Sequence, residues 1–293
     1  LVPLEPFWVF TGPWAARLAE AETEDSARTL LRDFAEAAPE AKATTVTVIP
    51  TDPPGLEGEC SDEGTHRYCV AAGSPVAPAG VQAWGMLVGY TPEVFCASDL
   101  NDLVCEATVE TLLIAAAEWG NYGPLEYWVV GLDEAATLDL IGVYCRREVE
   151  REHRTWRQCL RHETEGDGLI AYHRISADAV ASGRPKEDAC HCGKREWEMH
   201  WLSSSVPFGY TDLFDVSGTD AQGTQFHEYF HAVQMAHLMS RDHEFRYNGG
   251  GMGPVWFHEG GAVYMALSAI HRLKASGELP DVNVDGRWPF EFE

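Results

Sequence analysis

The sequence predicts an α+β fold in which an N-terminal α/β region with a mixed sheet is followed by a mostly helical region. Three observations support this prediction. Short apolar segments with strand spacing alternate with segments of helical spacing through the first half of the chain. Two long helical patterns cover residues 219–241 and 254–274, and a stretch rich in Gly, Asp and Cys precedes them. We therefore expect regions at 1–165 and 166–293, as two domains or one continuous domain.

In the first region, apolar spacing and turn residues indicate alternating strands and helices. Helical segments carry apolar residues three and four positions apart, whereas the strand segments are short and β-branched or continuously apolar. The expected elements, in order, are a helix over 15–38, a strand over 44–49, a loop over 50–80, a strand over 81–90, a helix over 99–119, a strand over 127–130 and a helix from 133 to about 148 or beyond.

In the second region, residues 163–195 are expected to be irregular because Gly, Asp and Cys recur there. Residues 196–203 alternate well enough for a strand, either an ordinary sheet strand or an edge strand that pairs with an extended peptide. A helix over 219–241 follows. Glycines at 249–251 and 253 then predict a loop, and Pro254 suits the first turn of a helix that runs to about residue 274.

Composition limits the classes of function. The chain has 293 residues, of which 45% are hydrophobic, so it can form a sizeable core. Its formal net charge of −25 argues against nucleic acid as a partner. The acidic excess predicts a solvated acidic surface, with a cation or basic-partner site as the alternative. Because no apolar run approaches the roughly 18–20 residues that cross a bilayer, no membrane span is expected.

Eight cysteines, an even number, favour disulfides and therefore a secreted or otherwise extracytoplasmic protein. The N-terminus lacks the basic start and apolar stretch of a signal peptide, so a mature chain whose leader has been removed is expected. Two pairs, Cys60 with Cys69 and Cys96 with Cys105, are each nine residues apart, which suits short closed loops.

The pairing of the other four cysteines stays open in the sequence. If one straight helix held Cys145 and Cys159, they would be about 21 Å apart. Cys190 and Cys192 can be at most about 7 Å apart in an extended chain. Pairing the first two with the second two therefore requires the helix to break or turn before Cys159. The alternative for Cys190-His191-Cys192 is a zinc or redox site.

The sequence H-E-x-x-H occurs at residues 227–231. His227 and His231 are four apart, so on a helix they project from one face and can bind one zinc ion. Glu228 lies beside them as a proton-transfer group. Catalytic zinc needs three protein ligands and an open position for water, whose pKa the metal lowers toward about 7. Glu259, 28 residues after His231, is the candidate third ligand.

Residues 256–262 read Trp-Phe-His-Glu-Gly-Gly-Ala and follow the pattern W-[LF]-x-E-G-x-A. With both motifs, residues 196–275 resemble the gluzincin metallopeptidases, zincins whose third ligand is a glutamate on a following helix. The resemblance implies a zincin-like catalytic region with His227, His231 and Glu259 as Zn²⁺ ligands. It implies Glu228 as general base and acid. Gln234 makes the first motif similar to the H-E-x-x-H-x-x-Q variant of bacterial peptidase-MA-like proteins.

Side chains other than the candidate ligands and Glu228 are expected to support the site, to lie in the core or to bind the oxyanion. We expect His258 to support the ligands or the fold rather than to bind metal, because it lies about 100° round the helix from Glu259. Tyr229, Phe230 and Tyr264 are expected in the core. Oxyanion donors are needed for amide hydrolysis, and the sequence does not choose among its candidates. These candidates are Tyr210, His243 and Tyr247.

The functional expectation is a secreted zinc-dependent metallopeptidase that acts on a peptide or protein substrate. One alternative is a non-catalytic extracellular structural or interaction protein on a gluzincin scaffold, which would retain zinc without turnover. Another is a zinc amidase that acts on a non-peptide bond. The intact Glu228 favours catalysis, because a non-catalytic scaffold has no need of a general base.

Overall fold

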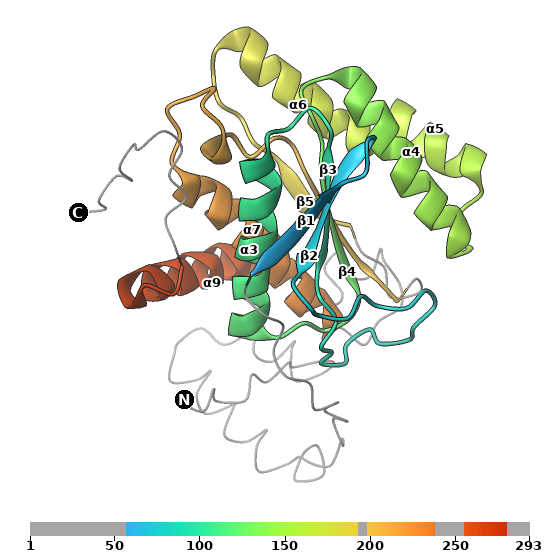
Figure 1. Cartoon of the computed structure of the whole chain (residues 1–293). Helices are drawn as coiled ribbons and strands as arrows, with labels where there is room; N and C mark the ends of the chain where they lie inside the picture. The colour runs from blue at the N-terminus through green and yellow to red at the C-terminus, as the bar shows by residue number, and fades with distance from the viewer. Residues whose placement is uncertain (1–56, 193–197, 238–254, 280–293) are drawn as a thin grey trace. The chain divides into compact units, whose positions relative to one another are not determined.

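A computed structural model describes residues 57–192, 198–237 and 255–279, all of which belong to one compact unit. The α+β class is confirmed: a mixed sheet lies between two layers of helices (Figure 1). Its six strands follow the order β1-β2-β3-β4-β6-β5. They are β1 (Gly58–Asp62), β2 (His66–Ala71), β3 (Glu93–Ala97), β4 (Leu125–Val129), β5 (Ala189–His191) and β6 (His200–Ser204). The β3–β4 and β4–β6 pairs are parallel, and the other pairs are antiparallel.

The helices divide between the two faces of the sheet. The helical elements are α3 (Asp102–Trp119), α4 (Glu134–Glu150), α5 (Trp156–Glu165), α6 (Leu169–Ser182), the 3₁₀ turn η3 (Phe208–Tyr210), α7 (Gly218–Ala236) and α9 (Val255–Ser276). In Figure 1, α3 and α7 lie on one side of the sheet and α4, α5 and α6 on the other, while α9 packs against α7.

Strand β4 shows that both faces of the sheet are buried beneath helices. Tyr127 and Trp128 are neighbours on this strand, so their side chains point to opposite faces, yet each is only 1% exposed. Tyr127 joins an apolar cluster with residues of α3, α7 and α9, whereas Trp128 joins a second cluster with residues of α4, α5 and α6. A strand buried on both faces reads as a continuous apolar run, which is how the sequence revealed β4.

Several predicted elements are confirmed. Helix α3 begins after Asn101, whose side chain accepts a hydrogen bond from the Val104 N–H, and Asp133 caps α4 in the same way through Ala135. The strand expected over 127–130 is β4, and the helices expected over 219–241 and 254–274 are α7 and α9. The helix expected over 15–38 and the strand expected over 44–49 lie outside the described residues.

Three predicted elements are wrong. Residues 81–90 form a loop, because Gly85 has φ +77° and packs its backbone against the Ala236 carbonyl at the end of α7. The loop expected over 50–80 contains the β1–β2 hairpin, whose polar sequence gives no apolar alternation. The irregular stretch expected over 163–195 contains α6, whose first N–H, on Leu169, donates to the Glu163 carboxylate of α5.

The strand expected over 196–203 overlaps β6, and it is not an edge. Strand β6 is hydrogen-bonded to β4 on one side and to β5 on the other, so it has no free side for a peptide. The edge strands of the described sheet are β1 and β5. The pairing of β4 with β6 also means that residues before and after position 165 share one sheet.

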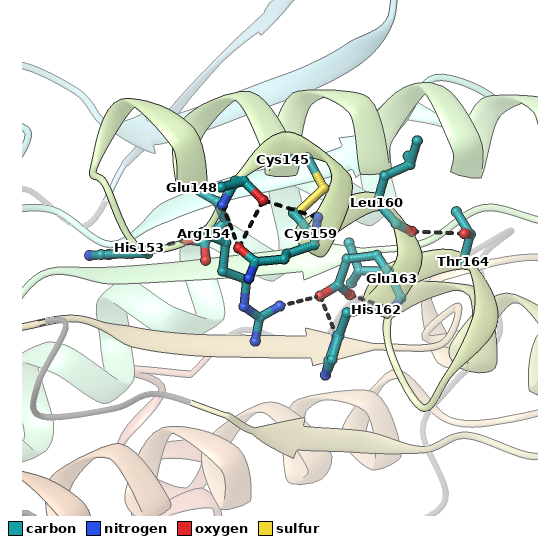
Figure 2. Close-up of a disulfide and its surroundings, with 12 residues drawn as sticks. Cys145, Glu148, His153, Arg154, Cys159, Leu160, His162, Glu163 and Thr164 are labelled. Carbon is teal, nitrogen blue, oxygen red and sulfur yellow. Dashed lines mark hydrogen bonds and ion pairs between the residues drawn. A yellow bond between two sulfur atoms is a disulfide. The ribbon is translucent and has the colours of Figure 1, made fainter.

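All eight cysteines form disulfides. The pairs are Cys60–Cys69, Cys96–Cys105, Cys145–Cys159 and Cys190–Cys192. The first two are the pairs expected from their spacing. Cys145 and Cys159 come within 5.5 Å between their Cα atoms because α4 ends at Glu150 and the chain turns back into α5 (Figure 2). Because both sulfurs of Cys190-His191-Cys192 are bonded to each other, these cysteines hold no zinc in this form, while a redox role for the pair stays a prediction.

None of the described helices is long and apolar enough to cross a membrane.

Candidate metal centre

Helix α7 carries the H-E-x-x-H motif, and one side of the helix faces the core while another side carries the two histidines. Ser217 caps its N-terminus by accepting the Thr219 N–H, and the chain then continues without Pro through Ala236. Phe226 and Tyr229 are buried in the core shared with α3, and the Tyr229 hydroxyl donates to the Gly120 carbonyl at the end of that helix. These contacts anchor one side of α7 in the core, and His227 and His231 project together from a different side of the helix.

Helix α9 brings the second motif to α7. Its buried side includes three small residues, Ala262, Ala266 and Ala269, each at most 4% exposed, which lets the two helices approach closely along that part of α9. Glu259 lies near the start of α9 and is the least enclosed member of the site, with 46% of its side chain exposed. The centre is therefore open to solvent on the Glu259 side.

Three atoms converge between these helices. The Nε2 atoms of His227 and His231 are 3.0 Å apart, and the Glu259 Oε2 lies 3.2 Å from the first and 3.3 Å from the second. Ligands bound to a tetrahedral zinc ion at about 2.0–2.1 Å would be separated by roughly 3.3 Å. The three side chains form a group that could hold a metal ion, and this donor set of two imidazoles and a carboxylate fits zinc.

The protonation of this group favours metal binding. Burial and the neighbouring His231 lower the pKa of His227, although Glu259 opposes them. Burial alone would raise the pKa of Glu259, but His231, His227 and His258 in their protonated forms would hold that pKa below its ordinary value. A neutral imidazole and an ionised carboxylate are the forms that bind metal ions.

Glu228 borders the group without belonging to it. Its side chain is nearly buried, at 9% exposure, and its Oε1 lies 3.9 Å from the His227 Nε2. Burial raises the pKa of Glu228 to about 8, with contributions from the Glu259 and Asp188 charges, while a backbone hydrogen bond from His191 lowers it. A divalent cation between the histidines would act in the opposite direction and favour the carboxylate.

Two further side chains support the converging atoms. The Gln234 Oε1 accepts a hydrogen bond from the His231 Nδ1, 2.8 Å away, and the Gln234 Nε2 donates one to the His258 carbonyl, 3.1 Å away. The His258 imidazole is buried, and its Nε2 lies 3.1 Å from the Glu259 Oε1. His258 therefore contacts a candidate ligand and lies outside the group, as its position on the helix indicated.

The other residues singled out in the sequence agree with the structure in some cases and differ from it in others. Tyr229 lies in the core, as expected, whereas the expectation for Tyr264 is wrong because its side chain is 69% exposed on the outer side of α9. Tyr210, a candidate oxyanion donor, is fully buried, and its hydroxyl bonds Gln225 and Thr111 in the core. The other two candidates, at positions 243 and 247, lie outside the described residues.

Sequence reasoning missed the contribution of strand β5. Its His191 donates a backbone N–H to Glu228, and the Asp188 charge acts on the same carboxylate. A backbone donor has no side-chain signature, so no residue pattern could reveal this contact. Only the Cys190-His191-Cys192 spacing hinted at an extended segment there, because residues two apart lie on one face of a strand.

Comparison with known proteins finds no matching family model, no matching curated protein and no matching solved structure. The chemistry of the centre is therefore inferred from its own residues.

Proposed function

We propose that this chain is a secreted zinc-dependent metallopeptidase of the gluzincin type, with Glu228 as general base. One observation carries the proposal: His227, His231 and Glu259, from two separate helices, point one atom each at a common position, and a nearly buried carboxylate lies next to them. Structural zinc sites usually have four protein ligands, whereas three ligands and an adjacent carboxylate are typical of a catalytic site.

The residues divide the chemistry between them. His227, His231 and Glu259 would hold the metal, and a bound Zn²⁺ would supply a water of lowered pKa and polarise the substrate carbonyl. Glu228 would accept a proton on its carboxylate and pass it to the nitrogen of the leaving amine. The hydrogen bond from the His191 backbone orients that carboxylate between the sheet and the histidines.

Secretion is supported by the disulfides. The four disulfides use every cysteine of the chain, and such bonds persist in oxidising compartments.

The test combines metal analysis with peptide cleavage. We expect about one zinc per purified chain. In Glu228→Gln we expect the same zinc content and a loss of kcat/KM of roughly 10²–10⁴-fold, the usual contribution of a general base. A peptide library read by mass spectrometry supplies the substrates.

Glu148→Gln is the matched control. Glu148 is also buried with a pKa raised by burial, but it lies on α4, on the opposite face of the sheet. Its variant should cleave as the wild type does. A wild type without bound metal, or full activity in Glu228→Gln, would overturn the proposal. Bound zinc with no cleavage of any peptide would favour the non-catalytic scaffold instead.

A further inference from the structure

Gln234 is the side chain through which α7 and α9 are joined at the metal centre. It is half-buried one turn after His231, and both ends of its amide are engaged. The Oε1 lies 2.8 Å from the His231 Nδ1, and the Nε2 lies 3.1 Å from the His258 carbonyl oxygen. One partner is a candidate metal ligand on α7, and the other is the backbone next to the candidate ligand on α9.

The backbone partner fixes the orientation of the amide. A carbonyl oxygen can only accept, so the Gln234 Nε2, which is the donor, must face His258. The Oε1 then faces His231 and can only accept, which requires the proton of the imidazole to lie on Nδ1. The His231 Nε2 is left with its lone pair toward His227 and Glu259.

From this geometry we infer that Gln234 is a positioning residue: it selects the metal-binding tautomer of His231 and holds α9 in register with α7. The inference rests on the proposed zinc site, although not on peptide cleavage. Metal-binding histidines commonly donate their second ring N–H to a carboxylate or a backbone carbonyl. Here a carboxamide takes that place, and it connects one ligand to the helix that carries another.

The hydrogen bonds continue to the third ligand. His258, whose carbonyl accepts from Gln234, directs its own Nε2 at the Glu259 Oε1, while the Glu259 Oε2 faces the two histidines. Gly261 leaves space for this arrangement, since a Cβ atom at that position would lie 3.3 Å from the Gln234 Nε2. A side chain at position 261 would therefore press on the amide.

Metal affinity is the measurement that tests the role. Zn²⁺ binding is measured in competition with a chromophoric chelator, and the visible spectrum of the Co²⁺-loaded protein reports ligand geometry. Gln234→Met keeps the length of the side chain and removes both hydrogen bonds. We expect its Zn²⁺ affinity to fall about 10–100-fold, with a changed Co²⁺ spectrum. Gln234→Glu keeps an acceptor for the His231 N–H but loses the donor to the His258 carbonyl, so we expect a loss of affinity smaller than that of Gln234→Met.

Gln225→Met is the matched control. Gln225 lies on the same helix, is 1% exposed and also uses both ends of its amide, but its partners are Tyr210 and Thr108 in the core. The Gln225→Met protein should be less stable than the wild type, but its Zn²⁺ affinity and its Co²⁺ spectrum should be unchanged.

Three results would overturn the inference. The first is a Gln234→Met protein that binds Zn²⁺ as tightly as the wild type. The second is an equal loss in Gln225→Met. The third, which also decides the matter if Gln234→Met does not fold, is a Gln234→Glu protein with the Zn²⁺ affinity and Co²⁺ spectrum of the wild type, because this variant lacks the donor to the His258 carbonyl. A wild type that binds no Zn²⁺ overturns the proposed function as well, so the two failures are distinguishable.

Discussion

Glu187 shows how one buried carboxylate can make the stability of this chain depend on pH. Burial raises its pKa to about 7, and the Asp220 charge adds to this, while backbone N–H groups of Phe208 and Gly209 bind the carboxylate and lower it. Its Oε1 has no hydrogen-bond partner among the residues that the structure describes. The folded state therefore retains a proton that the unfolded chain releases near pH 4–5.

This difference makes folding less favourable as pH rises from about 4.5 to 7, since the folded state binds more protons over that range. Glu187→Gln removes the charge and keeps an oxygen for the two backbone donors. We expect a gain of roughly 1–3 kcal/mol in unfolding free energy at pH 8 and little change at pH 5. Urea unfolding of the wild type and of Glu187→Gln at pH 5 and pH 8 measures this difference in unfolding free energy. An equal gain at both values would rule out ionisation of Glu187 as the cause.

At the scale of single residues, helix geometry made the centre predictable. The spacing of His227, Glu228 and His231 along one helix sets their relative directions, whereas Glu259 was predicted from the resemblance of residues 256–262 to a family pattern. The supporting hydrogen bonds were not predictable in the same way. Whether Gln234 reaches the His258 carbonyl depends on how closely α9 approaches α7, and that distance depends on packing.

The error at Tyr264 has the same origin. Helical periodicity gave its angle from Glu259, but it could not say which side of α9 meets α7. The buried side proves to be the one with Ala262, Ala266 and Ala269, and Tyr264 lies on the other. A helix with apolar residues on both sides does not reveal its packed face by pattern alone.

Among the elements, α3 and α4 were predicted with the help of their own caps, whereas α5 was missed although Thr155 caps it, and α6, which is capped from elsewhere, was missed as well. Asn101 and Asp133 are N-cap residues, and they mark the starts of α3 and α4 in the sequence. Helix α6 begins instead at Gly168, without a side-chain cap, and the N–H of Leu169 is satisfied by Glu163. Glu163 also accepts from Arg154, so an ion pair and a helix start share one carboxylate (Figure 2).

The turn between α4 and α5 is closed by Cys145–Cys159, which spans 14 residues. In the chain-entropy account, a loop of this length restricts the unfolded chain by about 3 kcal/mol. We expect the double variant Cys145→Ala/Cys159→Ala to lose roughly 2–4 kcal/mol of unfolding free energy, measured by urea unfolding. Its Zn²⁺ affinity should stay unchanged, because the disulfide and the metal centre lie on opposite faces of the sheet. A parallel loss of metal affinity would mean that the two helical layers are coupled.

For the whole molecule, the separation of the layers has a consequence for folding. The layer of α4 to α6 has its own apolar cluster and its own buried ion pairs, in which Arg147 and Arg151 meet the fully buried Glu126. The centre lies in the other layer, between α7 and α9. Strand pairing, two apolar clusters and four disulfides do not require a metal, unlike small zinc domains that fold only with the ion.

We therefore expect metal removal to weaken the protein without unfolding it. A metal that binds only the folded state stabilises it by about 2.7 kcal/mol at a free concentration 100 times its Kd, which corresponds to roughly 5–10 °C in Tm for a chain of this size. Thermal unfolding followed by far-ultraviolet circular dichroism, with excess Zn²⁺ and with chelator, measures the difference. The chelated protein should keep its spectrum at 25 °C.

Glu259→Gln separates the centre from the fold in this experiment. The Glu259 side chain is 46% exposed, so its substitution should leave the metal-free protein as stable as the wild type. It removes the anionic member of the proposed ligand set, and the Zn²⁺-dependent rise in Tm should therefore shrink or disappear. If Zn²⁺ raised the Tm of this variant as much as that of the wild type, the metal would be bound elsewhere. If chelation unfolded the wild type at 25 °C, the α7–α9 contact would depend on the ion, and its small-residue packing alone would not hold it.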